Sequence, residues 1–406
     1  MTQSVNGVID HLFRRQSGRM VSMLTAVFGS RHLSLAEEVV QDALLRALEL
    51  WPFQGIPDNP QAWLLRVARN LALDRLRRQS SLTSKIPELE RRMSLAPAAC
   101  DLADEQLAMM FLCCHPSLPE PARLCLTLKL VAGFSTAEIA RALLTREDAV
   151  AQRIVRAKRQ IREQNIPLDL PAPEHLPQRL QSVLEALYLI FNEGYSASSG
   201  ESLLRRDLCD EAIYLTSLLA ANPHTALPKT HALLALQYLH AARLDARTDA
   251  SGDLLLLEQQ DRALWDRRAI ALGFHHLDQS AQGDEITPFH IQAAIAAQHA
   301  GDATDWSYIV TLYDQLYQLQ PSPVILLNRA VALARRDGPR AGLAAVETIA
   351  RDPALARYYL LPAVKAALHQ EAGERTLAAA SYMDALGCPS NAAERRFLER
   401  RLQGLQ

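Results

Sequence analysis

Apolar residues recur every three or four positions along most of the chain, and this spacing predicts helices rather than strands. The clearest case lies between Ser135 and Arg162, where two short helices are predicted with a tight turn between them. On the second of these helices, Val150, Ile154, Ala157 and Ile161 share one face. The pattern therefore predicts a helix-turn-helix unit whose second helix packs through that face.

Capping signals support both helix starts. Ser135 precedes Glu138 by three residues, and Thr145 precedes Asp148 by the same spacing. Each pair can form a reciprocal capping box, which satisfies backbone N–H groups at a helix start. The apolar face of the first helix would consist of Ile139, Ala140 and Leu143.

Long polar and basic side chains occupy the remaining faces of the second helix. A supported helix with outward donors is suited to the DNA major groove, where arginine prefers guanine and glutamine prefers adenine. An ordinary helical hairpin with a solvated charged face is the alternative that this segment alone leaves open. The candidate DNA-binding positions are Arg146, Gln152, Arg153, Val155, Arg156, Lys158 and Arg159.

Two further helices are predicted upstream. Residues 36–48 form an amphipathic pattern with an acidic start, and residues 61–78 form a second one. Between them, Trp51–Pro60 contains three prolines and a glycine, which predicts a loop. The second helix has a dense positive edge, offset by Asp74 and made of Arg66, Arg69, Arg75, Arg77 and Arg78.

The order of these segments resembles that of extracytoplasmic-function sigma factors, members of the sigma-70 family. The VVQDALLRAL helix, the loop and the NPQAWLLRVARNLALDRLRR helix are similar to sigma region 2, and the STAEIA helix-turn-helix is similar to region 4. The resemblance covers about residues 10–164. The FLCCHP segment (Phe111–Pro116) and the helical C-terminal half resemble a subgroup with a tetratricopeptide-like extension. Leu144 stands where the family often has glycine, which leaves the geometry of the turn open.

The resemblance implies binding to core RNA polymerase and to two elements of promoter DNA. Contacts to polymerase would come from the helix over 36–48, through Glu38, Gln41, Asp42 and Arg46. The second helix would recognise the −10 element through Asn70 and Asp74, with a flipped base held by the loop from Gln54 to Asn59. The five arginines at its positive edge would hold phosphates. In the helix-turn-helix, Gln152, Arg153 and Arg156 would contact bases of the −35 element, and Arg146, Lys158 and Arg159 would contact phosphates.

Composition and charge agree with this organisation. Apolar residues are 49% and aromatic residues 6%, which suits helices rich in leucine and alanine. Through Ile166 there are 22 Lys and Arg against 17 Asp and Glu, whereas the remainder has 21 against 28. A basic front and an acidic rear are typical of a nucleic-acid module joined to another kind of module. We expect an all-α protein with region 2 at 1–80, a linker at 81–104, region 4 at 105–165, a proline-rich linker at 166–178 and a helical extension at 179–406.

The C-terminal half predicts a helical array. Two helix pairs, 324–334 with 340–349 and 356–371 with 374–386, have turn glycines Gly338 and Gly373, which are about one tetratricopeptide repeat apart. Pro362 would either kink the third of these helices or mark its true start. Such an array often binds a peptide or another domain, although a purely structural role is the alternative. Helices are also predicted over 179–190, 207–219, 229–244, 259–272 and 287–300, with a polar turn at 192–200.

Other classes of protein are disfavoured. No signal peptide or membrane-spanning run is apparent, so we expect a cytoplasmic protein with reduced thiols, no membrane association and no cofactor. Cys113, Cys114 and His115 lack a second cluster and make a poor zinc site; a buried helix end stopped by Pro116 is the better interpretation. No phosphate loop, HExxH motif or nucleophile elbow points to an enzyme. Asn192, Glu193 and Tyr195 would either line a pocket or, as we favour, satisfy the turn.

Two rival hypotheses stay open. A helix-turn-helix regulator with a tetratricopeptide-like sensor explains residues 135–162 but not the upstream arginine helix. A scaffold that acts through its C-terminal array is the second rival. Copurification with core polymerase would separate the sigma-factor hypothesis from the regulator.

Overall fold

Helices make up nearly all the secondary structure in the part of the chain that the structure describes. This computed structural model describes residues 5–78, 102–143, 145–196, 204–249, 252–301, 303–389 and 391–405. Within these ranges the extended pairing is a single isolated bridge between Thr248 and Leu254, so the all-α prediction is confirmed. Most of the predicted linker at 81–104 lies outside the described residues, and its last three residues begin helix α5 (Leu102–Cys113).

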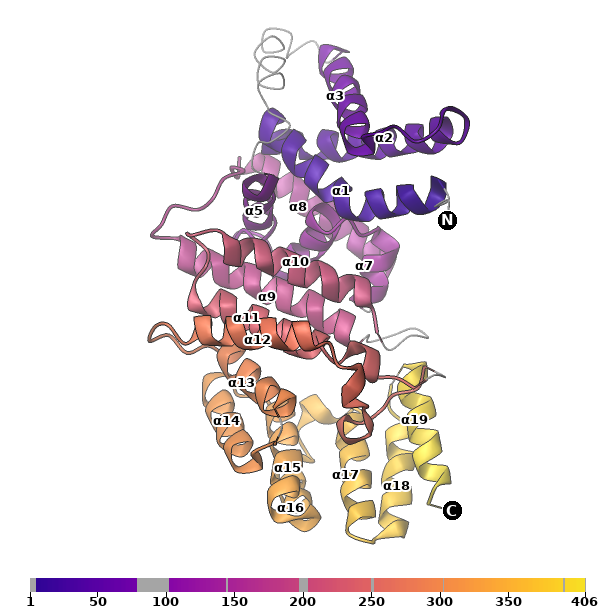
Figure 1. The fold of residues 1–406 in the computed structure, drawn as a ribbon, viewed down its shortest axis with the longest axis vertical. Coiled ribbons are helices and arrows are strands. Elements are labelled where there is room, and N and C mark those ends of the chain that lie inside the picture. Colours follow the sequence, from indigo (N-terminus) through magenta and orange to yellow (C-terminus); the bar gives the residue numbers. More distant parts are fainter. Residues whose placement is uncertain are drawn as a thin grey trace. The chain divides into compact units, whose positions relative to one another are not determined.

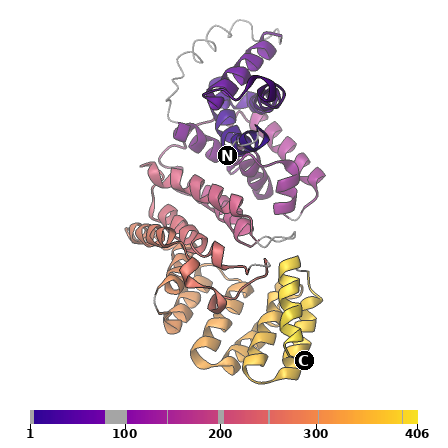
Figure 2. The same cartoon turned by 45° about the vertical axis from the view of Figure 1, so that its right-hand side comes forward.

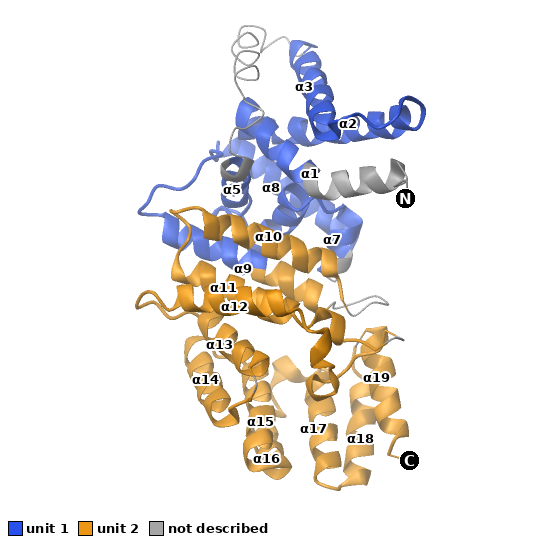
Figure 3. Ribbon diagram, in the orientation of Figure 1, with its two compact units in different colours: residues 1–187 blue, residues 188–406 orange. Residues whose placement is uncertain are grey.

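Two compact units divide the chain, Met1–Leu187 and Tyr188–Gln406 (Figure 3). The division falls within helix α9 (Leu176–Tyr195) rather than in the proline-rich segment that precedes it. The first half of α9 therefore belongs to the first unit. There Arg179 Nη2 donates to the carbonyl of Phe111 at 2.7 Å, and Arg123 Nη1 donates to Ser182 Oγ at 3.3 Å.

The first unit contains both predicted DNA-binding segments (Figure 1). Its elements, in order, are α1 (Val5–Phe28), η1 (Ser30–His32), α2 (Leu33–Gln54), α3 (Pro60–Arg78), α5 (Leu102–Cys113), α6 (Glu120–Leu126), the π-helical segment η3 (Thr127–Val131), α7 (Thr136–Ala142) and α8 (Glu147–Glu163).

One close approach shows how tightly this unit is packed. A Cβ atom added to Gly18 of α1 would lie 2.1 Å from the carbonyl oxygen of Val131, at the end of η3. Because real Cβ atoms do not come so close, only glycine lets α1 approach η3 in this way. This contact joins a helix upstream of the arginine helix to the segment just before the helix-turn-helix.

The predicted loop from Trp51 is wrong over its first four residues, because α2 continues through Gln54. Proline normally disrupts a helix interior, yet Pro52 lies in the last turn of α2, where few backbone bonds follow it. Trp51 is buried, and its ring centroid lies 5.5 Å from that of Trp63 in α3. This packing holds the last turn of α2 in place and shortens the loop to Gly55–Asn59.

The second unit consists of the end of α9 and successive helices (Figures 1 and 2). They are α10 (Arg206–Ala221), α11 (Pro228–Ala241), α12 (Arg267–Ser280), α13 (Pro288–Ala300), α14 (Trp306–Leu319), α15 (Pro323–Asp337), α16 (Pro339–Ile349), α17 (Leu360–Glu371), α18 (Arg375–Leu386) and α19 (Ala392–Gln403). Short 3-10 turns lie at η4 (Leu244–Ala246), η5 (Leu257–Gln259), η6 (Arg262–Leu264) and η7 (Pro353–Leu355).

Both predicted helix pairs at the C-terminal end are confirmed as paired helices. Gly338 separates α15 from α16 with φ of 94°, and Gly373 separates α17 from α18 with φ of 82°. These values lie in the region that glycine adopts without a steric penalty. Pro362 lies in the first turn of α17, where no N–H donor is needed, so it marks the helix start rather than a kink.

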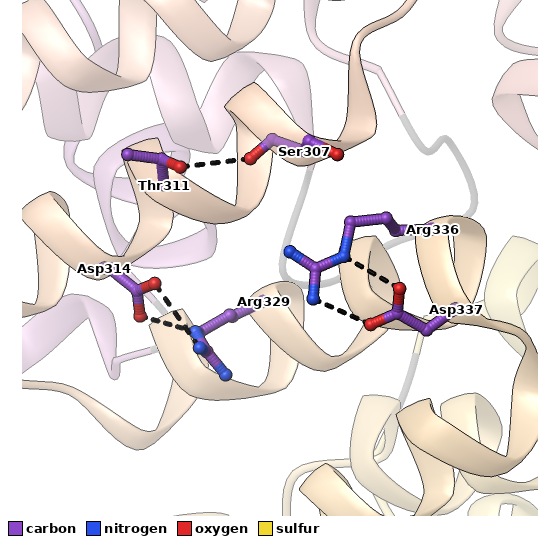
Figure 4. A network of polar contacts seen from close by, with 6 residues as sticks. All are labelled: Ser307, Thr311, Asp314, Arg329, Arg336 and Asp337. Carbon is purple, nitrogen blue, oxygen red and sulfur yellow. Dashed lines mark hydrogen bonds and ion pairs between the residues drawn. The ribbon is translucent and has the colours of Figure 1, made fainter.

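Helices α14 and α19 were not predicted from the apolar pattern; an ion pair joins α14 to α15, and a side-chain cap marks the start of each unpredicted helix. Arg329 of α15 binds Asp314 of α14 through two hydrogen bonds of 2.6 and 3.3 Å, and neighbouring Arg336 and Asp337 also pair (Figure 4). Helix α14 begins where the Asp305 carboxylate accepts from the backbone N–H of Tyr308. Helix α19 begins at a capping box formed by Asn391 and Glu394.

Two predictions in this unit are wrong. The helix over 259–272 starts only at Arg267, because the Asp266 carboxylate caps it, and η5 and η6 occupy the preceding residues. Helix α9 continues to Tyr195, so Asn192 and Glu193 are helical rather than part of a polar turn. Tyr195 stacks on Phe191 and lies beneath the Arg247 guanidinium, which indicates a packing role.

Candidate nucleic-acid and polymerase interface

The capping box predicted at the start of the first helix of the helix-turn-helix is present. Ser135 N donates to Glu138 Oε2 at 2.8 Å, and Glu138 N donates to Ser135 Oγ at 3.2 Å, which completes the capping box of α7. Leu143, also predicted for the packed face, lies just after α7 and is only half-buried. The other predicted residues of that face are buried; they are Ile139, Ala140, Val150, Ile154, Ala157 and Ile161. Buried apolar side chains on both helices hold α8 against α7 and expose its other side.

The second capping prediction is wrong. Helix α8 begins at Glu147, with Arg146 at the N-cap position and no side-chain cap. Thr145 instead donates its backbone N–H to the carbonyl of Ala140 at 2.9 Å. Glu147 and Asp148 in the first turn favour the helix start electrostatically. Leu144 lies outside the described residues.

Most candidate DNA-binding residues of α8 face outward. Val155 is 65% exposed, and Arg159 pairs with Glu163 on the same exposed side at 2.7 Å. Arg153 is half-buried. The exposed positions are Arg146, Gln152, Val155, Arg156 and Arg159.

Lys158, a predicted phosphate contact, differs from its exposed neighbours on α8 because its side chain is largely buried. Its ammonium forms an ion pair with Glu37 of α2, which also receives Lys129 Nζ at 3.7 Å. The side chains of Lys158, Glu37 and Lys129 are only 15%, 14% and 18% exposed. This cluster therefore joins α2 to α8 and η3 inside the first unit.

A second ion-pair cluster joins α2 to α3. Arg75 Nη1 lies 2.7 Å from Glu38 Oε2, and Arg75 Nη2 lies 2.5 Å from Asp42 Oδ2. Arg75 was predicted to hold phosphate, and the two carboxylates were predicted to contact polymerase. The structure brings these three residues together instead. Gln41 and Arg46, the other predicted polymerase contacts, are exposed on α2.

The segment from the last turn of α2 to the start of α3 has one capping residue and one exposed aromatic ring. Asn59 Oδ1 accepts from the backbone N–H of Ala62 at 3.0 Å, so this predicted base-binding side chain caps α3. Gln54 is exposed at the end of α2. Phe53 is 89% exposed, and Ile56 is 38% exposed. Sequence reasoning missed Phe53, although an aromatic residue among prolines and polar residues is a usable signal.

The positive edge of α3 faces outward apart from two of its arginines. Leu64, Ala68 and Leu76 are buried on the opposite side. Arg69 is half-buried, and Arg75 belongs to the ion-pair cluster described above. Arg77 lies 3.6 Å from Asp74 on the exposed face. The exposed polar residues of this edge are Arg66, Asn70, Asp74, Arg77 and Arg78.

The FLCCHP segment contains the buried end of α5, which stops at Cys113, and continues to a half-buried His115 and an exposed Pro116. Cys113 and Cys114 are fully buried, and burial raises the pKa of both thiols, that of Cys114 to about 11. Cys114 Sγ lies 3.4 Å from Thr127 Oγ1, and His115 Nδ1 lies 2.7 Å from Ser117 Oγ. Among the described residues, no group of three or more His, Cys, Asp or Glu side chains could hold a metal ion. The segment therefore packs the first unit.

Known protein families match three segments of the chain. Sigma-70 region 2 matches residues 12–82, and sigma-70 region 4 matches residues 108–161. Residues 179–281 match a family of unknown function, DUF6596. The chain therefore contains sigma-70 regions 2 and 4 followed by a C-terminal extension. These two regions indicate sigma-factor function, which is not enzymatic and implies binding to core RNA polymerase and promoter DNA.

A full-length relative shows the family of this chain. This chain is 41% identical to the "Uncharacterized protein R00370" of Rhizobium meliloti (strain 1021) over 387 residues, which cover 92% of this chain and 91% of the relative. The chain belongs to the same family as that protein. No solved structure matches. Within the described residues, no helix has the length and apolar character needed to cross a bilayer.

Proposed function

We propose that this chain is an extracytoplasmic-function-type sigma factor that directs core RNA polymerase to promoters with separate −10 and −35 elements. The observation that carries the proposal is the presence, in one compact unit, of two basic helices with buried apolar faces and outward cations. Two supported helices of this kind can contact two stretches of one duplex. The matched regions 2 and 4 coincide with these helices.

The −10 element would be bound by α3 and the preceding loop. Arg66, Arg77 and Arg78 hold phosphates, and Asn70 faces the same side for base contacts. A flipped base needs a partner that offsets the loss of stacking. Phe53, with its exposed ring beside the loop, supplies a stacking surface.

The −35 element would be bound by the outer face of α8. Gln152 and Arg156 lie one turn apart on the exposed side, where both can reach base edges. Arg146 and Arg159 flank them and hold phosphates. Arg153, being half-buried, contributes at the margin of this surface.

Polymerase binding would use the exposed polar face of α2. Gln41 and Arg46 project from this helix, and Glu38 remains 63% exposed despite its pairing with Arg75. Asp42 is more enclosed by the same guanidinium. We assign Asp42 chiefly to orienting α2 and α3, and the other three to contacts with polymerase.

The C-terminal helices would regulate this activity in cis as a tetratricopeptide-like array that takes a peptide or another domain. Paired helices with glycine turns about 35 residues apart support the repeat interpretation. The acidic balance of the C-terminal half and its continuity with region 4 through α9 support regulation within one chain.

The proposal is tested by core polymerase binding and by truncation. Full-length protein should copurify with core polymerase, and the double variant Gln41→Ala, Arg46→Ala should bind core polymerase more weakly. For the truncation, the chain should end after Ser196 rather than within the proline-rich segment, because the first half of α9 packs on α5. Circular dichroism should first show that residues 1–196 remain helical and unfold cooperatively on heating. Altered promoter-specific transcription by this truncated chain then supports regulation in cis. Failure to bind core polymerase contradicts sigma function.

A further inference from the structure

A cavity of about 530 Å³ lies within the second unit, between the end of α9 and helices α11, α13, α14 and α15. This volume falls within the range of about 300–1,000 Å³ that is typical of small-molecule sites. The residues around it include no aspartate and no glutamate; they are Tyr188, His240, Arg243, Leu257, Gln292, Ile295, Ala296, His299, Tyr313, Leu316, Gln320, Ser322, Val324, Ile325 and Asn328.

Two buried histidine nitrogens in its wall have no partner. Nδ1 of His240 and Nδ1 of His299 are inaccessible to solvent and make no hydrogen bond in the described structure. Because solvent does not reach either atom, neither is a contact for a bound molecule, and the two rings matter here through their charge. Burial, followed by the nearby Arg243 charge, lowers the pKa of both rings, that of His299 to about 4. Both imidazoles are therefore neutral at neutral pH.

Arg243 is consequently the charged side chain that lines this cavity, and the lining contains no carboxylate to pair with it. Its Nη2 donates to the Tyr195 hydroxyl, and its guanidinium lies 5.7 Å from the ring centroid of Trp265. Neither neighbour is an anion, and Arg243 forms no ion pair with any described residue. A guanidinium held beside a cavity by neutral groups favours an incoming carboxylate.

The rest of the wall suits an apolar, flat body. Ile295, Leu316 and Val324 provide aliphatic surface, and Tyr188 and Tyr313 provide aromatic surface. The Tyr188 hydroxyl donates to Gln292 Oε1 at 2.8 Å, which fixes both side chains and leaves the amide NH₂ of Gln292 as a donor. A few oriented polar groups on a mainly apolar wall are typical of ligand sites.

We propose that this cavity binds a small organic acid, with its carboxylate near Arg243 and its apolar body between the tyrosines and the aliphatic side chains. The inference does not depend on sigma function, since binding is measured directly on the chain. It gives the C-terminal extension a small-molecule site in addition to any protein partner.

Three indole compounds with the same ring and different charge test the proposal on the full-length chain. Indole-3-acetate carries a carboxylate, indole-3-ethanol is neutral and tryptamine is cationic. Saturation-transfer NMR should show saturable binding of the acid, about tenfold or more tighter than that of the other two, because a hydrogen bond to a charged group contributes about 1.5–3 kcal/mol. Equal affinity for all three, or no saturable binding of the acid, would overturn the proposal.

Two variants place the binding in this cavity. Gln292→Glu retains the acceptor for Tyr188 but adds a negative charge to the wall, and Arg243→Gln removes the cation; each should weaken binding of the acid about tenfold or more. Gln318→Glu, at an exposed position of α14 outside the cavity, is the matched control and should leave binding unchanged. Wild-type affinity in Gln292→Glu, or an equal loss in the Gln318→Glu control, contradicts the assignment. Because Gln292→Glu is nearly isosteric, its result stands even if Arg243→Gln perturbs folding.

Discussion

Helices α3 and α8 are both basic and both amphipathic, and on each of them some cations pair with carboxylates of α2 while others face outward. On α3, Arg75 faces α2 and pairs with Glu38 and Asp42, whereas Arg66 and Arg78 face outward. On α8, Lys158 faces α2 and pairs with Glu37, whereas Arg156 faces outward. Helix α2 therefore supplies carboxylates to both basic helices.

The two clusters differ in burial, and this difference determines what each contributes. The Glu37 cluster is about 15% exposed, so loss of one partner would leave a charge in a place that water barely reaches. The Arg75 cluster is about one-third to two-thirds exposed, and exposed ion pairs contribute little to stability. We infer that the first cluster holds regions 2 and 4 together, whereas the second orients α3 on α2.

The largest expected effect is on stability, from Lys158→Met. Removal of one partner from a fully buried pair costs about 3–5 kcal/mol; here Lys129 still faces Glu37, so we expect about 2 kcal/mol. Urea unfolding of the full-length chain should show the loss in the transition that reports on the first unit. Arg159→Met, on the exposed side of the same helix, is the matched control and should leave stability nearly unchanged, because exposed ion pairs contribute little.

A double variant sharpens this prediction. The double variant Glu37→Gln, Lys158→Met removes both charges. Its loss in the free energy of unfolding should therefore be smaller than the sum of the losses in the two single variants. Strict additivity would show that the two side chains do not interact, and would contradict a joining role for this cluster.

The next effect is expected on promoter recognition, from Arg156→Ala. Loss of one bidentate base contact should reduce discrimination between matched and scrambled −35 elements by about 1–3 kcal/mol. Electrophoretic mobility-shift titration of the holoenzyme on the two DNAs measures the difference. Arg162→Ala, at an exposed position of the last turn of α8, serves as a control for charge alone. Equal weakening on both DNAs would argue against base recognition by Arg156.

The smallest effect is expected on the salt dependence of DNA binding, where Arg66→Ala should differ from Arg75→Ala. Arg66 is an outward phosphate contact in our account, so its loss should weaken binding on all sequences and lower the salt slope by about 1. Arg75 is already paired, so its loss should leave the salt slope nearly unchanged. DNA affinity measured over a series of salt concentrations distinguishes the two. Identical slopes for both variants would contradict the division of cations described above.

Local features of the fold were predictable from the sequence, whereas distant pairings were not. The buried face of α8 and the Ser135–Glu138 box depend on residues within a few positions of one another, and both are confirmed. The Lys158–Glu37 pair joins residues 121 positions apart, and no local spacing reveals it. For the same reason, the outward and inward arginines of α3 could not be separated from the sequence.

The other errors have physical reasons of the same kind. A proline-rich stretch predicted a loop from Trp51, but the burial of Trp51 against Trp63 keeps that turn helical. Asp305 and Asn391 start α14 and α19 through side-chain caps, which the apolar pattern alone does not show. Packing and capping therefore moved or added elements without changing the helical class.

The most direct test of sigma function is run-off transcription by purified core RNA polymerase on a library of promoter fragments, with and without the full-length chain. Our account predicts transcripts with defined start sites that depend on the chain, and loss of those transcripts with Arg66→Ala and Arg156→Ala combined. Absence of any chain-dependent start site, for both the full-length chain and the chain ending after Ser196, would contradict it.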